Sequence, residues 1–153
     1  MHILELKVPP PGVMLVTAGV MWFASKTVPA LEFALPAREV FAVLFAAAGL
    51  ATSAMGIVSF VRAKTTVNPM QPDKASSLVV SGIFAHSRNP MYLGLLLILV
   101  GWAWYLSNVL AFLLLPGFVL YMNRFQIEPE ERALSTLFGQ AFVAYKSRVR
   151  RWI

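Results

Sequence analysis

Two clusters of polar residues stand out in an otherwise apolar chain. The first surrounds Arg88-Asn89 and includes Tyr92, and the second contains the neighbouring carboxylates Glu130 and Glu131. An arginine suits a ligand carboxylate because its guanidinium group can donate two parallel hydrogen bonds, and a carboxylate suits an ammonium group or the hydroxyls of a ribose. Brought together, the two clusters could bind a small molecule that carries charges of both signs.

Each cluster also has a structural interpretation that involves no ligand. Asn89 is suited to cap a helix that has Pro90 in its first turn, while Arg88 anchors the headgroup interface of a membrane. Pro129 favours a further helix start, and acidic residues in a first turn suit the positive end of the helix dipole. This interpretation leaves Tyr92 unexplained, so both interpretations stay open.

The composition places these clusters in a membrane protein. Hydrophobic residues make up 58% of the 153 residues and charged residues 13%, against roughly 45–50% apolar and roughly 25% charged in an average soluble domain. A single domain of this length cannot bury so many apolar side chains, because a small domain leaves much of its surface exposed. The composition therefore excludes a soluble globular domain and a disordered chain.

The uncharged stretches predict an all-α, polytopic fold with about four transmembrane helices. The uncharged run 89–123 is too long for one helix across a hydrocarbon core of about 30 Å, so it folds back on itself. Ser107-Asn108 is the most polar point near its centre and predicts a tight turn, while Pro116-Gly117 predicts a kink in the last helix. The predicted spans are residues 11–25, 40–61, 90–106 and 109–123.

The basic residues predict how these spans are oriented. Four spans place both termini on one side, together with most lysines and arginines, and leave Lys26 and Arg38 on the other. Because lysine and arginine concentrate in cytoplasmic loops, the termini are expected to face the cytoplasm. The net charge of +6 then suits anionic lipid headgroups and not nucleic acid. We expect a protein of a prokaryotic inner membrane.

The segment after the fourth span predicts a cytoplasmic amphipathic helix. Its apolar residues repeat every three or four positions, which is the period of a helix, and Gly139 is a point where it could bend. An interfacial helix that lies on the membrane is the alternative. No metal site is expected, because the chain has no cysteine and two histidines far apart in sequence.

Considered together, the two clusters resemble the isoprenylcysteine carboxyl methyltransferase and phospholipid methyltransferase superfamily of integral membrane enzymes. The segments SGIFAHSRNPMYLG and PEERALSTLFGQAFVAYKSRVRRW, separated by a helical hairpin, carry the resemblance over about residues 76–151. The matching positions are Gly82, Phe84, Arg88, Asn89, Pro90, Tyr92 and Gly94, then Glu130, Glu131, Leu134, Phe138, Gly139, Phe142 and Tyr145.

The resemblance implies a methyltransferase that uses S-adenosylmethionine and releases S-adenosylhomocysteine. It implies a cofactor pocket on the cytoplasmic side and a lipophilic methyl acceptor in the membrane. The carboxylate of a prenylcysteine-like substrate is the first expectation for the acceptor. Phosphatidylethanolamine, or a small lipophilic amine or thiol, is the second, and a non-enzymatic four-span scaffold is the alternative outside the enzymes. The implied cofactor-binding residues are Gly82, Phe84, Arg88, Asn89, Tyr92, Glu130 and Glu131.

The chain departs from the family pattern at two informative places. Asn89 stands where eukaryotic members usually have histidine, which changes one expected cofactor contact. An arginine just before the acidic pair is tied to catalysis in the carboxyl methyltransferases, and Arg124 is the expected catalytic residue here. Gln126 is the alternative for that place, because the intervening Glu128-Pro129 shifts the alignment.

Overall fold

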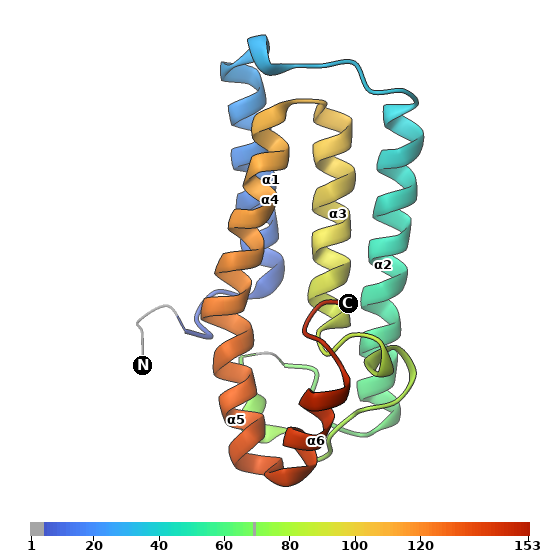
Figure 1. The fold of residues 1–153 in the computed structure, drawn as a ribbon, viewed down its shortest axis with the longest axis vertical. Coiled ribbons are helices and arrows are strands. Elements are labelled where there is room, and N and C mark those ends of the chain that lie inside the picture. Colours follow the sequence, from blue (N-terminus) through green and yellow to red (C-terminus); the bar gives the residue numbers. More distant parts are fainter. Residues whose placement is uncertain (1–4, 69) are drawn as a thin grey trace.

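The fold is built from helices, and the described part of the chain contains no β-strand (Figure 1). The computed structural model describes residues 5–68 and 70–153. The all-α membrane fold predicted from composition is confirmed. The helices are α1 (Pro10–Thr27), α2 (Arg38–Arg62), α3 (Pro90–Leu106), α4 (Val109–Tyr121), α5 (Glu128–Phe138) and α6 (Gln140–Arg148), with short 3₁₀ turns at Pro29–Leu31, Pro72–Lys74 and Gly82–Ala85.

The helices α1 to α4 form a bundle in which α3 is central. α2 packs along α3, while α1 packs on both α3 and α4. The four helices occupy the stretches predicted as spans. The predicted turn between α3 and α4 is present: Ser107 adopts a left-handed conformation (φ 48°), and Asn108 Oδ1 accepts a hydrogen bond from Leu110 N at 3.0 Å. This turn makes α3 and α4 antiparallel.

Glycines allow α2 and α3 to approach closely. A Cβ atom at Gly94 would overlap the carbonyl oxygen of Gly49, and one at Gly56 would lie 2.8 Å from Met91 Cγ. Ser53 Oγ donates a hydrogen bond to the Met91 carbonyl at 3.3 Å across the same contact. Small residues at a helix interface are typical of membrane proteins, where close packing replaces the hydrophobic effect. The start of α3 is therefore fixed rigidly against α2.

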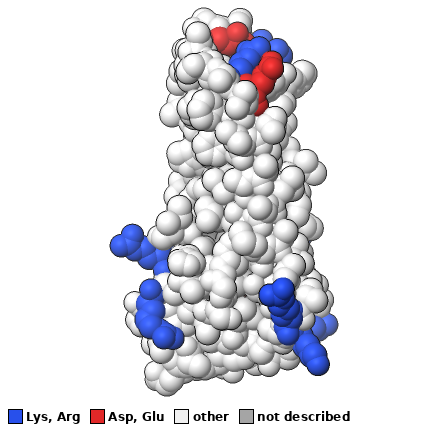
Figure 2. Space-filling model, turned by 90° about the vertical axis from the view of Figure 1, so that its right-hand side faces the viewer, with Lys and Arg blue, Asp and Glu red and all other residues white. Residues whose placement is uncertain are grey.

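A band without charged groups separates the two ends of the molecule (Figure 2). Helix α2 and the continuous helix Val109–Phe138 are long and apolar enough to cross a membrane, while α3 is apolar but shorter. Basic groups lie at the lower end of the view, and basic and acidic groups share the upper end. The crossing of α1 and α3 stays a prediction.

The fourth helix does not end at the predicted membrane exit. A π-helical turn at Met122–Ile127 joins α4 to α5, so that Pro129 lies inside a continuous helix and does not begin a separate one. The wider turn accommodates the proline, which has no N–H group to donate. A 30-residue helix is about 45 Å long, against a hydrocarbon core of about 30 Å. The helix is therefore longer than the hydrocarbon core is thick, and we expect its charged last turns, which carry the acidic pair, to lie beyond the core.

The predicted amphipathic tail consists of two helices. Gly139 adopts a backbone conformation (φ 52°, ψ −126°) that residues with a side chain avoid, and it interrupts the helix between α5 and α6. Because of this break, α6 turns back toward α3. There Phe142 and Tyr145 pack with Phe84 in a small second core.

Candidate active site

A cavity lies at the end of the bundle where α3 begins. The connection after α2, the first turn of α3, and the helices α5 and α6 form its walls. The two polar clusters of the sequence therefore meet in one place. Six of the seven residues predicted to bind a cofactor line the cavity: Phe84, Arg88, Asn89, Tyr92, Glu130 and Glu131.

Glu131 is the centre of an ion-pair network in the cavity wall. Arg88 Nη2 lies 2.9 Å from its Oε1, Arg151 donates hydrogen bonds to both oxygens at 3.0 and 2.8 Å, and Lys146 Nζ lies 3.6 Å from Oε2. Burial opposes ionisation of the carboxyl, but Arg151, Arg88 and Lys146 outweigh it and hold the pKa of Glu131 below its usual value. Glu131 is therefore ionised and holds Arg88 in place.

Glu130 has a different environment from its neighbour. Tyr92 Oη donates a hydrogen bond to Glu130 Oε1, and Gln126 Nε2 donates to the same oxygen at 3.2 Å. Burial raises the pKa of the Glu130 carboxyl to about 7, although these two hydrogen bonds act in the opposite direction. Two adjacent carboxyl groups thus differ in acidity, and Glu130 can exchange a proton near neutral pH.

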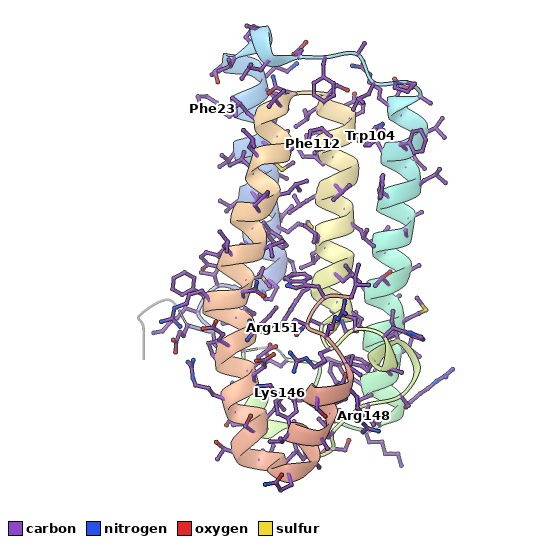
Figure 3. All side chains as sticks on the ribbon, viewed as in Figure 1. Phe23, Trp104, Phe112, Lys146, Arg148 and Arg151 are labelled. Carbon is purple, nitrogen blue, oxygen red and sulfur yellow. The ribbon has the colours of Figure 1, made fainter. Side chains whose placement is uncertain are left out.

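The chain after α6 closes one side of the site. The Arg150 carbonyl accepts a hydrogen bond from Arg88 N at 3.0 Å, and the Arg151 carbonyl accepts one from Asn89 Nδ2 at 2.9 Å. Figure 3 shows Arg151 and Lys146 at this end of the molecule. Asn89 occupies the capping position of α3, but its side chain makes no capping hydrogen bond. The amide of Asn89 holds the final segment of the chain instead.

Comparison with known proteins identifies the family of this chain. A family model described as phospholipid methyltransferase matches residues 37–141, a range that runs from the start of α2 through both polar clusters. The chain belongs to the phospholipid methyltransferase family. The superfamily resemblance found in the sequence is thereby confirmed, and membership implies methyltransferase activity at a membrane.

One relative in this comparison has no stated function. The chain is 49% identical over 63 residues to an uncharacterized protein of Haemophilus influenzae, and the match covers 41% of this chain and all of that relative. No solved structure matches the chain.

The cavity walls fit the cofactor that methyltransferases of this kind generally use, S-adenosylmethionine. The Nε and Nη1 atoms of Arg88 are buried without a hydrogen-bond partner. Unpaired buried donors are rare in proteins, and these two suit a ligand carboxylate. Apolar and aromatic side chains of the same cavity, among them Phe84, Leu134 and Phe142, suit an adenine ring. Arg88 and the apolar wall together thus match a molecule with a carboxylate at one end and an aromatic base at the other.

Two predicted site residues do not line the cavity. Gly82 opens the 3₁₀ turn that carries Phe84, and its φ of +63° is a left-handed conformation that favours glycine. Arg124 is 41% exposed and pairs with Glu128 at 3.2 Å and Glu5 at 3.5 Å. Its catalytic role stays a prediction, whereas the alternative, Gln126, is buried and contacts Glu130.

The sequence prediction missed two basic residues and one chain segment of the site. Arg151 and Lys146 belong to the basic tail of the chain. Contact with anionic lipid headgroups accounts for basic residues there, and no pattern in the sequence linked these two to Glu131. The segment Thr65–Asn68 also lines the cavity. It is held by hydrogen bonds such as that from Ser76 N to Thr65 Oγ1 at 3.0 Å, which a sequence pattern does not reveal.

Proposed function

We propose that this protein transfers a methyl group from S-adenosylmethionine to the amine of a membrane phospholipid such as phosphatidylethanolamine. The observation that carries the proposal is the partly buried carboxyl of Glu130, which lines the cavity beside Tyr92 and Gln126. The family match supports the lipid acceptor. The basic residues at the cavity end support a cytoplasmic position for the site.

The acceptor amine needs a proton acceptor, and Glu130 can supply one. A protonated amine has no lone pair, so it must lose a proton before its nitrogen forms a bond to carbon. The Glu130 carboxylate can take this proton, because the pKa of its carboxyl is raised to about 7. Tyr92 and Gln126 hold the carboxyl by the hydrogen bonds described above. A carboxylate acceptor needs no base, and the negative charge of Glu130 would repel it.

The cofactor would lie on the Arg88 side of the cavity. Arg88, held by Glu131, would bind the cofactor carboxylate through its unpaired nitrogens. Phe84 and the apolar wall would cover the adenine and exclude water, and Asn89 would fix the segment that closes the site. The bound cofactor supplies a methyl group on a sulfonium, which is already activated for transfer. The protein therefore contributes mainly alignment and a dry site.

Radiolabelled methyl transfer tests the proposal. The purified protein is incubated with methyl-labelled S-adenosylmethionine and, in separate reactions, phosphatidylethanolamine or a prenylcysteine. We expect base-stable label in the phospholipid, which identifies N-methylation. Base-labile label in the prenylcysteine would identify a methyl ester and would contradict the amine proposal. Absence of S-adenosylhomocysteine binding by calorimetry would instead favour the non-enzymatic scaffold.

A further inference from the structure

A polar hollow lies at the end of the bundle opposite the cavity. It is lined by residues of the α1–α2 connection and of the α3–α4 turn, including Ser25, Glu32 and Ser107. Two basic side chains, Lys26 and Arg38, also line it. Neither forms an ion pair with a carboxylate of the described residues, whereas the basic residues around the cavity do. The hollow therefore offers two cations that form no ion pair within the described part of the chain, beside the single carboxylate of Glu32.

An apolar groove begins where the hollow ends. α1 and α2 both pack on α3, and the groove runs between them with Leu99 and Gly101 of α3 among the residues that line it. Small side chains of the two outer helices, Ala18 and Ala46, leave room in its walls. Along α3 the groove extends from Ile98 to Tyr105, which is about 10 Å.

Tyr105 connects the hollow and the groove, because it lines both. The Arg38 guanidinium lies 5.7 Å from the centre of its ring, and the ring of Trp102 stacks on it at 5.5 Å. Trp102 Nε1 in turn donates a hydrogen bond to the Ala18 carbonyl at 3.0 Å, which ties α1 to α3 beside the groove. A cationic hollow and an apolar groove thus form one continuous surface with a rigid aromatic boundary.

We propose that this surface binds one phospholipid molecule, with its phosphate between Lys26 and Arg38 and one acyl chain in the groove between α1 and α2. Lys26 and Arg38 outnumber the one carboxylate of the lining, Glu32, so the hollow keeps a positive charge that complements a phosphate diester. Both cations lie at helix ends, the level at which headgroups meet the protein. The bound lipid fills a groove that α1 and α2 leave open and holds the two helices together. Figure 2 places this charged end beyond the uncharged band, on the side remote from the cavity. The site is therefore distinct from the proposed catalytic site.

Native mass spectrometry of the delipidated protein tests this site without reference to methyl transfer. The protein in detergent is titrated with dioleoylphosphatidylglycerol or with dioleoylglycerol, which has the same chains and no phosphate. We expect one retained phosphatidylglycerol and about ten-fold weaker retention by the double variant Lys26→Gln/Arg38→Gln. The matched control Arg62→Gln/Lys64→Gln removes two cations from the opposite end and should retain the lipid as the wild type does.

A second variant tests the groove. Ala46→Phe should lower retention of phosphatidylglycerol while leaving the cations in place, and circular dichroism checks that each variant is folded. Any of these results would overturn the proposal: equal retention of dioleoylglycerol by the wild type, unchanged retention by Lys26→Gln/Arg38→Gln, or equal loss in the control variant. Retention that Ala46→Phe leaves unchanged would also overturn it, because the lipid would then lie elsewhere.

Discussion

Replacement of Arg88 by alanine should weaken binding of S-adenosylhomocysteine much more than binding of a shortened analogue. Two nitrogens of Arg88 are buried without partners in the cavity wall. A ligand carboxylate would accept charge-assisted hydrogen bonds from them, which together contribute about 2–3 kcal/mol. Loss of that contribution corresponds to roughly 30- to 150-fold in Kd. Isothermal titration calorimetry in detergent measures the change directly.

5′-Methylthioadenosine, which lacks the amino-acid portion of the cofactor, is the control ligand. Its affinity should be the same for the wild type and for Arg88→Ala. The control variant Arg148→Ala removes an exposed arginine that donates to its own helix and should bind both ligands normally. Because Glu131 keeps Arg151 and Lys146 as partners, Arg88→Ala should still fold, which thermal unfolding checks. Equal loss of affinity for both ligands, or none for either, would refute the assignment of Arg88 to the carboxylate.

Three further predictions concern the acidic pair and the helix contact. Glu130→Gln should slow methylation of an amine by about 100-fold or more in initial-rate assays. Wild-type activity should rise with pH through about 7, because the Glu130 carboxyl must be ionised to take a proton. A flat pH profile would contradict this role. The ionised Glu131 carboxylate stabilises the fold, because its pKa in the folded protein is lower than the ordinary value. This stabilisation is fully present above the ordinary pKa and is lost as the pH falls through the lowered pKa. Acid should therefore reduce the melting temperature of the wild type more than that of Glu131→Gln. Gly94→Ala should cost about 1–3 kcal/mol of stability in denaturant titrations, because the new methyl group overlaps the Gly49 carbonyl, whereas Gly19→Ala, with nothing within 4 Å, should have no such cost.

The helices of this protein could be predicted because their determinants are local. Charge-free runs, the prolines Pro10 and Pro90 at helix starts and the polar turn at Ser107-Asn108 each act over a few residues, and each gives a helix or a turn in the structure. Pro129 is the exception, because the π-helical turn before it lets the helix continue. The meeting of Arg88 with Glu131 depends on distant parts of the chain. It could be predicted because both residues fall in motifs that resemble a known family.

The remaining features of the site depend on tertiary packing that leaves no local pattern. Arg151 binds Glu131 only because Gly139 turns α6 back toward α3 and the final segment then pairs with the backbone of Arg88. In the same way, the side chain of Asn89 bonds to this segment, although the sequence favours its use as a helix cap. Such choices between equally good hydrogen-bond partners are settled by the whole fold.

The π-helical turn at Met122–Ile127 makes the orientation of the acidic pair sensitive to chain length. Each residue added to or removed from a helix rotates everything beyond it by about 100°. Deletion of one residue from this turn would convert it to ordinary α-helix and swing Glu130 and Glu131 around the helix, away from Tyr92 and Arg88, while α4 stayed unchanged. A related sequence with a single-residue gap at this point would therefore keep the helical bundle but would not bring the acidic pair to Tyr92 and Arg88.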